Sequence, residues 1–494
     1  MKKRIVSFVS VTVFIFTAII GRLGYIVLSD NYTASEGYNS YSVTVAADYP
    51  TLYYSDCSRL TNNVSRYAAV IKPTANCIAE LPKLFTTAEI NSISEELKSG
   101  YPVVKIIDTN PKTKYIKIIK VCATDSNKLQ IISSQSSGLQ KYMKNEVGKI
   151  TADYSVDALG RMLSGDQGEI KYNSYHDADG YILTIDKKVQ RVTELACKNM
   201  TSGCAIVMEV NSGKILSCVT KPGYSYLNKP LSNYAVGSIF KIVVALCAIE
   251  NNVDLKYKCN GNIKVGDTEF SCSNKIKHGY EHLEEGLANS CNCYFINLAL
   301  HLGEKKLLHT AKKLGFNETT ELFDGWIIKN ASLPTHSDLN SSGQLSLFGF
   351  GQGKLTVSPL QMCSTLCTIG NYGLRTQPFL VQGTVDSNGK KSMYSIDSNR
   401  VVNKENAKKL LSYLRYVVTD GTGRLAESSD HLSSGKTATA QTGQFEDGKE
   451  LLNTWFGGLY PYDNPKYAIV VMTERGTSGS KDCCPIFRTS VENL

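Results

Sequence analysis

The sequence lacks the features that usually mark nucleic-acid-binding and metal-binding proteins. Its formal net charge is only +9 over 494 residues, and its lysines are scattered rather than gathered into a basic arm. It has no C-x-x-C pair and no cluster among its seven histidines, so we expect no metal and no cofactor. No low-complexity tract or fixed-period repeat occurs either. An anionic membrane or wall surface is a more natural partner for this charge than a nucleic acid.

Charged residues are also absent from a long stretch near the N-terminus. A basic cluster at 2–4 precedes an uncharged apolar run over 5–21, and the apolar character continues beyond Arg22. Because about 20 residues cross a hydrocarbon core, we predict a cytoplasmic tip at 1–4 and a single transmembrane signal anchor at 5–28. A cleaved signal peptide is the alternative, but no small-x-small cleavage site is well placed. The basic cluster predicts that everything beyond the anchor lies outside the cytoplasm.

The cysteine count is odd. With 15 cysteines, at least one thiol stays unpaired within a monomer. Cys259 and Cys272 flank a hairpin-like segment and are the best candidates for a disulfide in an exported domain. Four other cysteines look less like a disulfide framework: Cys291, Cys293 and the adjacent pair Cys483-Cys484.

The pattern of predicted helices and strands changes near residue 180. Its length exceeds one compact core and predicts two to three folded units. Residues 29–180 predict an α+β pedestal domain, with a helical pattern over 86–99 and a hairpin of 103–108 with 115–121. Residues 181–494 run from strands through many helices back to strands. That order predicts a sheet packed by helices, in which the first and last strands meet.

Ser238 and Lys241 form the first candidate catalytic pair. Their S-x-x-K motif precedes a long apolar run, and residues three apart lie on the same face of a helix. A neutral Lys241 can take the proton of the serine hydroxyl, and burial lowers the pKa of a lysine. The motif is short and therefore weak. It recurs at three serines that no apolar helix follows: Ser387, Ser433 and Ser478.

Two further motifs follow in the chain. Ser290 and Asn292 form an S-x-N between two helical patterns, where they could relay a proton and hold a substrate amide. Taken alone, they are more typical of a helix cap. Lys436, Thr437 and Thr439 form a K-T-x-T on a predicted strand, which suits carboxylate recognition and can supply a backbone N–H to an oxyanion. Taken alone, a polar edge strand is the better interpretation.

Together the three motifs, in this order and in these contexts, resemble those of the penicillin-binding proteins. The resemblance covers most of residues 180–490 and is closest to the monofunctional class B transpeptidases. No glycosyltransferase module precedes it, which separates the chain from the bifunctional class. The stretches that carry it are YILTIDKKVQ, GCAIVMEVNSGKILSCV, VGSIFKI, LANSCNCYFINLA, GFGQGKLTVSPLQM, GKTATAQ and TWFGGLYPYDNPKYAIVV.

The resemblance implies a fold and an activity. The expected fold is an α/β (α+β) serine transpeptidase/β-lactamase-like domain at 181–494, with an antiparallel sheet packed by helices. A transmembrane helix and the pedestal at 29–180 precede it. The implied activity is that of a peptidoglycan D,D-transpeptidase, which cross-links D-Ala-D-Ala stem peptides, releases D-Ala and is inhibited by β-lactams. A single-pass location in the bacterial cell membrane and a polytopic glycan polymerase as partner are implied as well.

Seven residues receive roles from the resemblance. Ser238 forms the acyl-enzyme and Lys241 activates it, while the backbone N–H groups of Ser238 and Thr439 form the oxyanion hole. Ser290 and Asn292 assist proton transfer and substrate placement. The terminal carboxylate binds to Lys436, Thr437 and Thr439.

One position departs from the family pattern, and other functions stay open. Ala438 stands where family members usually have glycine, and we expect its methyl group to alter ligand preference or slow acylation. A D,D-carboxypeptidase results if water reaches the acyl-enzyme. A catalytically weakened scaffold for the polymerase is another alternative. A serine β-lactamase is disfavoured because such enzymes are shorter and need an additional group to activate the deacylating water.

Overall fold

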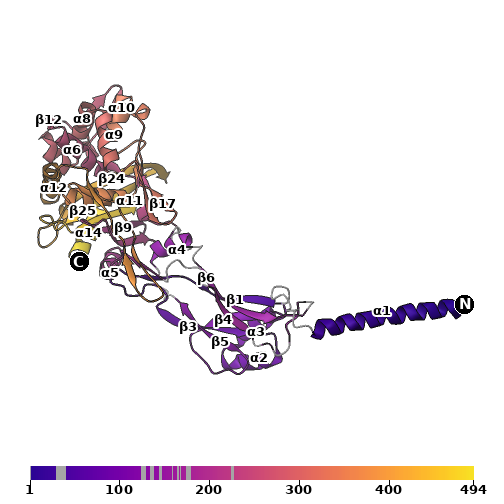
Figure 1. The fold of residues 1–494 in the computed structure, drawn as a ribbon. Helices are drawn as coiled ribbons and strands as arrows, with labels where there is room; N and C mark the ends of the chain where they lie inside the picture. Colours follow the sequence, from indigo (N-terminus) through magenta and orange to yellow (C-terminus); the bar gives the residue numbers. More distant parts are fainter. Residues whose placement is uncertain are drawn as a thin grey trace. The chain divides into compact units, whose positions relative to one another are not determined.

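The structure is a computed structural model that describes residues 2–28, 40–123, 129–133, 138–143, 147–157, 160–163, 166, 168–173, 180–223 and 227–494. Two compact units make up the chain, and Figure 1 shows their helices and strands. Two short segments that precede residue 180 belong to the second unit. Unit 1 comprises Met1–Tyr49, Val64–Ala123 and Val147–Tyr175, and unit 2 comprises Pro50–Asn63, Thr124–Glu146 and His176–Leu494.

Helix α1 (Lys2–Leu28) begins in the basic cluster and contains the apolar run. Of the helices within the described ranges, none combines the length and the apolar character needed to cross a membrane. The membrane anchor predicted for residues 5–28 is therefore not confirmed.

Unit 1 is built from two three-stranded antiparallel sheets. Strand β6 lies between β1 and β7 in one sheet, and β3 lies between β4 and β5 in the other. The hairpin predicted for 103–108 with 115–121 is wrong, because β3 separates β4 from β5. The bounds are β1 (Ser40–Asp48), β3 (Val64–Ile71), β4 (Val103–Ile107), β5 (Lys117–Ala123), β6 (Gly148–Ser155) and β7 (Glu169–Asn173).

Strand β3 contributes to two cores. Ala68 and Val70 pack with residues of β1 and β6, whereas Ala69 and Ile71 pack beneath the helices α2 (Ala75–Glu80) and α3 (Thr87–Leu97). This alternation is the period of two that a strand buried on both faces requires. Helix α3 confirms the helical pattern over 86–99, and a capping box of Thr86 and Glu89 closes its first turn.

Unit 2 is organised on a five-stranded antiparallel sheet with the order β10-β9-β26-β25-β24. Because β26 pairs with β9, the last strands of the chain lie beside the first hairpin of the unit, as predicted. Strand β24 is at one end of this sheet. The bounds are β9 (Gly203–Glu209), β10 (Ile215–Lys221), β24 (Ser434–Glu446), β25 (Lys449–Tyr460) and β26 (Tyr467–Glu474).

Helices cover both faces of this sheet (Figure 1). Side chains of β9 point alternately into two cores, with Ile206 in one and Val207 in the other. The predicted antiparallel sheet packed by helices is therefore confirmed. The first core contains α6 (Lys241–Glu250) and α11 (Pro359–Gly370), and the second contains α5 (Lys187–Ala196) and α14 (Cys484–Val491).

Other helices and small sheets also belong to unit 2. The helices are α4 (Leu139–Tyr142), α7 (Leu283–Ala288), α8 (Asn292–Leu302), α9 (Glu304–Lys313), α10 (Ser342–Gly349), α12 (Lys404–Thr419) and α13 (Gly479–Asp482). Two small sheets, given in strand order, are β2 (Thr51–Tyr53), β8 (Gly180–Leu183), β21 (Val381–Val385) and β22 (Lys391–Met393), and β11 (Tyr234–Ala235), β19 (Thr356–Val357) and β18 (Ala331–Ser332). Strand pairs are β12 (Tyr257–Cys259) with β15 (Gly279–Glu281), β13 (Asn262–Val265) with β14 (Thr268–Ser271), β16 (Thr319–Phe323) with β17 (Trp326–Lys329), and β20 (Leu374–Thr376) with β23 (Ser398–Arg400).

Candidate active site

The turn that carries Ser238 leads directly into a buried helix. Residues Gly237–Phe240 form a short 3-10 turn, and α6 continues from it. The apolar residues of α6 are buried, which holds the helix in the core of unit 2. Ser238 is only half-buried, whereas its neighbours Ile239 and Phe240 are fully buried. The hydroxyl of Ser238 therefore lies at the accessible start of a fixed element.

Two glycines allow the backbone to pass behind Ser238. Gly237 has a φ of +60°, and its N–H donates to the carbonyl oxygen of Gly351 at 2.9 Å. A Cβ at Gly351 would lie only 2.0 Å from the carbonyl oxygen of Gly237. Conformation and space both favour glycine here. The sequence motifs did not single out Gly351, although it belongs to the GFGQG stretch.

Lys241 is fully buried, and the S-x-N segment holds its ammonium group. Nζ donates to the backbone oxygen of Ser290 at 2.7 Å and to Asn292 Oδ1 at 2.8 Å. The Ser290 hydroxyl lies 3.4 Å from the same nitrogen. Nζ also lies 5.4 Å from the ring centroid of Phe295, a contact that the sequence did not reveal. The first two motifs therefore meet at one nitrogen.

Burial changes the acidity of Lys241. Loss of hydration lowers the pKa of its ammonium group to about 8. At neutral pH about one molecule in ten then carries the neutral amine, compared with about one in 2,500 for an exposed lysine. A neutral amine can accept the proton of a hydroxyl group. Within the described part of the chain the Ser238 hydroxyl makes no hydrogen bond to another residue, and catalytic hydrogen bonds often tighten only when substrate binds.

Ser290 and Asn292 lie at the bend between α7 and α8, where the sequence placed them. Ser290 has a left-handed φ of +56°, an uncommon conformation for a residue with a Cβ. The amide of Asn292 is held at both ends, because Oδ1 accepts from Lys241 and Nδ2 donates to the backbone oxygen of Ser271 at 3.0 Å. The bend thus presents two oxygens to Lys241 in fixed positions.

Lys436 approaches the same region from strand β24. The strand packs against the Ser238 turn, and a Cβ at Gly237 would lie 2.9 Å from the Cβ of Ala440. Lys436 is fully buried, and its Nζ donates to the backbone oxygen of Thr437 at 2.9 Å. Burial and the nearby charge of Lys241 lower the pKa of Lys436 well below its usual value. The third motif therefore lies close to the first.

The two threonines of the third motif have different surroundings. Thr437 is buried, and its hydroxyl lies 2.6 Å from that of Thr422 in a hydrogen bond. Thr439 is exposed, and its hydroxyl accepts from the N–H of Gly479 at 3.4 Å. Because β24 ends its sheet, its outer edge can pair with an extended peptide. The carboxylate-binding and oxyanion roles stay predictions.

Ala438 is packed inside unit 2. Its side chain is 3% exposed and belongs to the same apolar core as Ile239. It pairs across the sheet with Trp455, whose Nε1 donates to the backbone oxygen of Ala235 at 3.1 Å. The methyl group is therefore covered rather than displayed on the strand edge. Its expected effect on ligand preference stays a prediction.

The predicted disulfide between Cys259 and Cys272 is not formed. Their Sγ atoms lie 3.7 Å apart, whereas a disulfide bond is about 2.05 Å long. All 15 cysteines, each within the described ranges, are unpaired. Two thiols that looked unlike part of a disulfide framework, Cys291 and Cys293, lie close to Cys272.

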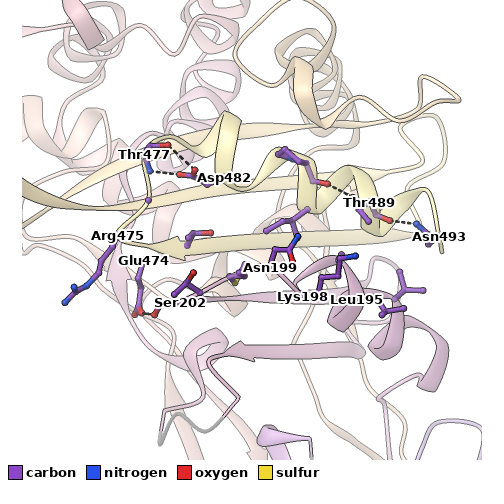
Figure 2. A pocket seen from close by; sticks show the side chains of 18 residues that line it. Leu195, Lys198, Asn199, Ser202, Glu474, Arg475, Thr477, Asp482, Thr489 and Asn493 are labelled. Atoms are coloured by element: carbon purple, nitrogen blue, oxygen red, sulfur yellow. Dashed lines mark hydrogen bonds between the residues drawn. The ribbon is translucent and has the colours of Figure 1, made fainter.

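A cavity of about 1040 Å³ lies among α5, β26 and α14. Figure 2 shows its lining, which includes Leu195, Asn199, Arg475 and Thr489. No residue of the three motifs is among those that line it. This cavity is therefore separate from the chemistry of Ser238 and Lys241.

Comparisons with known proteins agree with the motif geometry. Residues 203–492, more than half of the chain, match the family model of the penicillin binding protein transpeptidase domain. Stage V sporulation protein D of Bacillus subtilis is 28% identical over 383 residues, covering 68% of this chain and 56% of that protein. Penicillin-binding protein PbpB of Mycolicibacterium smegmatis is 27% identical, covering 67% of this chain and 59% of that protein. The chain thus spans less than two thirds of the length of these relatives.

The fold also resembles a solved structure. The D,D-transpeptidase domain of a peptidoglycan glycosyltransferase from Eggerthella lenta has a TM-score of 0.64 at 20% identity, covering 91% of this chain and 99% of that chain. At this identity the similarity concerns the fold alone. It agrees with the serine transpeptidase fold that the sequence implied.

Gly351 and Gly353 offer a matched test of the packing behind Ser238. Both have left-handed φ values, but a Cβ at Gly353 would meet nothing closer than 3.4 Å, whereas at Gly351 it would lie 2.0 Å from Gly237. We expect Gly353→Ala to lower the free energy of unfolding by about 1–2 kcal/mol through conformation alone. Gly351→Ala should lower it by about 3 kcal/mol or more, because the turn must also move. Urea unfolding measures both, and equal losses would contradict the contact.

Proposed function

We propose that this chain, which belongs to the penicillin binding protein transpeptidase family, cross-links peptidoglycan stem peptides through an acyl-enzyme on Ser238. One observation carries the proposal. The buried amine of Lys241, one helical turn from Ser238, is held by Ser290 and Asn292. A basic amine fixed near an accessible hydroxyl is the arrangement that serine acyl transfer needs.

In acylation one proton passes from Ser238 to Lys241 and then from Lys241 to the leaving group. Ser238 Oγ attacks the carbonyl carbon between the two D-Ala residues while its proton passes to the neutral Nζ of Lys241. The backbone N–H groups of Ser238 and Thr439 stabilise the tetrahedral oxyanion. The C–N bond then breaks, and Lys241 Nζ returns its proton to the leaving amine through the Ser290 hydroxyl, which lies 3.4 Å from Nζ. D-Ala departs, and the donor peptide stays as an ester on Ser238.

Strand β24 orients the donor peptide. An extended peptide pairs with the open edge of the strand, and its terminal carboxylate binds Lys436, Thr437 and Thr439. The buried lysines 241 and 436 leave this region with an excess of positive charge when both are protonated. Such a region favours an anionic substrate end.

The second half-reaction forms the cross-link. An amine of a neighbouring stem peptide attacks the ester carbonyl, gives up a proton to Lys241 and forms an amide. The bond to Ser238 Oγ breaks, and Oγ regains a proton from Lys241. Water in place of the amine would make the enzyme a D,D-carboxypeptidase. β-Lactams acylate the same serine and block both steps.

Unit 2 acts where stem peptides are found, on the outer side of the bacterial cell membrane. Residues 5–28 serve as the signal anchor, and a polytopic glycan polymerase is the partner. The uncharged run behind a basic cluster supports this topology. Carbonate extraction of membranes tests it: the chain should stay in the pellet, and a variant without residues 2–28 should be released. A chain that carbonate removes is not anchored.

Labelling with a fluorescent penicillin tests the nucleophile. The protein should label covalently, and Ser238→Ala should abolish labelling because no other hydroxyl replaces the attacking oxygen. Ser387→Ala is the matched control, since Ser387 also begins an S-x-x-K but lies in an exposed turn. Undiminished labelling of Ser238→Ala would show that the assignment is wrong.

A product assay separates transfer from hydrolysis. The protein is incubated with a D-Ala-D-Ala stem peptide and an acceptor amine, and the products are separated by chromatography. A cross-linked peptide together with free D-Ala supports the transpeptidase. Release of D-Ala without any cross-link identifies a carboxypeptidase instead.

Lys241 should make acylation depend on pH. Burial lowers its pKa to about 8, and only the unprotonated amine accepts the serine proton. The rate should therefore rise about tenfold per pH unit up to that value and level off above it. Time-resolved penicillin labelling between about pH 6 and 10 measures the profile, and Lys241→Arg, which stays protonated, should be inactive throughout. A flat profile below pH 8 would rule out Lys241 as the base.

A further inference from the structure

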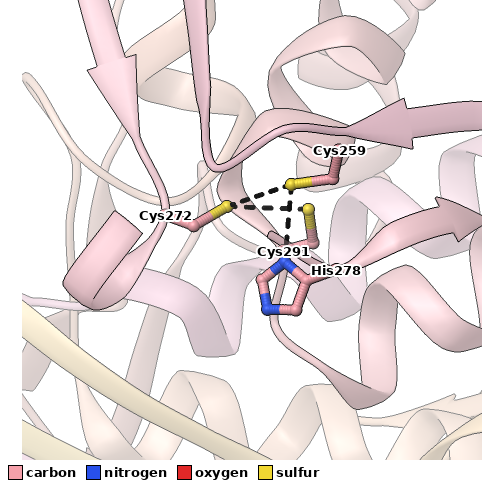
Figure 3. A group of neighbouring side chains, drawn as sticks. All are labelled: Cys259, Cys272, His278 and Cys291. Atoms are coloured by element: carbon pink, nitrogen blue, oxygen red, sulfur yellow. Dashed lines mark hydrogen bonds between the residues drawn. The ribbon is translucent and has the colours of Figure 1, made fainter. Parts of the chain in front are cut away.

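Four side chains that the proposed reaction does not use gather beside the S-x-N bend (Figure 3). The donor atoms of Cys259, Cys272, His278 and Cys291 all lie within 4.8 Å of one another. Cys272 Sγ lies 3.7 Å from the sulfurs of Cys259 and Cys291, and Cys259 Sγ lies 3.5 Å from His278 Nδ1. The three thiols are buried and His278 is half-buried. Three sulfurs and an imidazole nitrogen thus point at one small volume.

The local fold brings these donors together from irregular spacings. Cys259 ends β12 and Cys272 directly follows β14, while His278 directly precedes β15. Because β12 pairs with β15, Cys259 lies opposite Gly279, the neighbour of His278. Cys291 is the N-cap of α8. Ends of four separate elements therefore converge, although the sequence contains no C-x-x-C.

The distances match a tetrahedral zinc site. Zinc binds cysteine sulfur at about 2.3 Å and histidine nitrogen at about 2.0–2.1 Å. A tetrahedron with these bonds has sulfur–sulfur edges of about 3.8 Å and sulfur–nitrogen edges of about 3.5 Å. Two of the three sulfur–sulfur separations are 3.7 Å and one of the three sulfur–nitrogen separations is 3.5 Å, while all six are within 4.8 Å. Three of the six edges therefore already match those of a tetrahedral zinc site.

Disulfide formation fits the cluster less well. Cys272 Sγ is at nearly the same distance from three sulfurs, those of Cys259, Cys291 and Cys293, so no single pair is preferred. Each pair would also have to move closer by more than an ångström to reach the bond length of about 2.05 Å. Backbone N–H groups point at two of the sulfurs at 3.4 Å, Gly261 at Cys259 and Tyr294 at Cys291. Such hydrogen bonds stabilise a thiolate ligand.

We propose that Cys259, Cys272, His278 and Cys291 bind one zinc ion in a tetrahedral site with three sulfur ligands and His278 Nδ1. Each coordinating cysteine gives up its thiol proton to solvent when the metal binds. A fourth thiol, Cys293, lies 3.5 Å from Cys272 Sγ and can replace Cys291 if that residue is lost. Four protein ligands make the site a closed, structural one.

The zinc ion restrains the segment that forms hydrogen bonds with Lys241. Cys291 stands between Ser290 and Asn292, so a metal bond to its sulfur restrains the bend. On the other side, Asn292 already bonds to the oxygen of Ser271, next to Cys272. The metal therefore ties the β13–β14 hairpin to the bend through both neighbours. Its effect on acylation rests on the proposed function, whereas metal binding does not.

Metal analysis of the purified full chain tests the site directly. We expect about one zinc per chain by mass spectrometry of the elements, and a melting temperature that falls by about 5 °C or more when a strong chelator removes it. Readdition of zinc should restore the melting temperature. A chain that contains no zinc and takes none up under reducing conditions overturns the site. Stoichiometric iron or copper instead overturns the choice of metal.

Variants identify the ligands. Cys259→Ser and His278→Ala are each expected to lower zinc content at least tenfold, whereas Cys247→Ser, a buried cysteine outside the cluster, should keep it. Cys291 is a poorer choice because Cys293 can replace it. If a variant fails to fold, cobalt replaces zinc in the wild-type chain, and its absorption reports tetrahedral thiolate coordination. An octahedral cobalt spectrum would overturn the ligand set. A chain purified without reductant whose mass is lower by two hydrogens, as a disulfide would make it, would also overturn the ligand set.

Penicillin labelling distinguishes the effect of zinc on the S-x-N bend from the proposed function. Chelation of the wild-type chain should slow labelling at least tenfold, and zinc should restore it. Unchanged labelling of metal-free protein would show that zinc does not support acylation through the bend. If the zinc-loaded chain does not label at all, the proposed function fails, and metal content and melting temperature still decide the site.

Discussion

The proposed active site depends on burying one ammonium group. Lys241 is fully enclosed, and a buried lysine without partners strongly destabilises a fold. The oxygens of Ser290 and Asn292, at 2.7 and 2.8 Å, compensate for part of the lost hydration. Because the compensation is incomplete, the pKa falls and the amine can serve as a base. The bend between α7 and α8 must therefore hold its two oxygens in place for the lysine to be both tolerated and reactive.

The surrounding structure supplies that constraint from three directions. Helix α6 is anchored by apolar residues in the core beneath the sheet. The backbone of Gly351 presses on the Ser238 turn from behind, where no side chain fits. Strand β24 closes the third side and brings Lys436, a second buried cation, close enough for its pKa to be affected by Lys241. Ser290 keeps its left-handed φ of +56° while its backbone oxygen accepts the hydrogen bond from Lys241.

Local sequence patterns predicted individual helices and strands well, but they did not predict which distant segments contact one another. The apolar run behind Ser238 distinguished it from three other serines in S-x-x-K motifs, and the structure has the helix there. The meeting of β9 with β26 followed from the order of elements. The hairpin of 103–108 with 115–121 failed because periodicity does not say that β3 lies between them. The cysteine cluster was missed because its residues are far apart in the sequence and come together only through the β12–β15 and β13–β14 pairings. A disulfide was predicted there because Cys259 and Cys272 flank a hairpin-like segment of a domain expected to be exported.

The pairing of β9 with β26 governs the order in which unit 2 can be completed. Tyr467 lies opposite Glu209 in this pairing, so the middle of the sheet joins segments made early and late in synthesis. A chain that emerges N-terminus first exposes the apolar β9–β10 hairpin long before its neighbour exists. Contacts of such sequence separation are slow to form, and exposed strand edges invite association with other chains. The nascent chain therefore needs protection until its last strand is available.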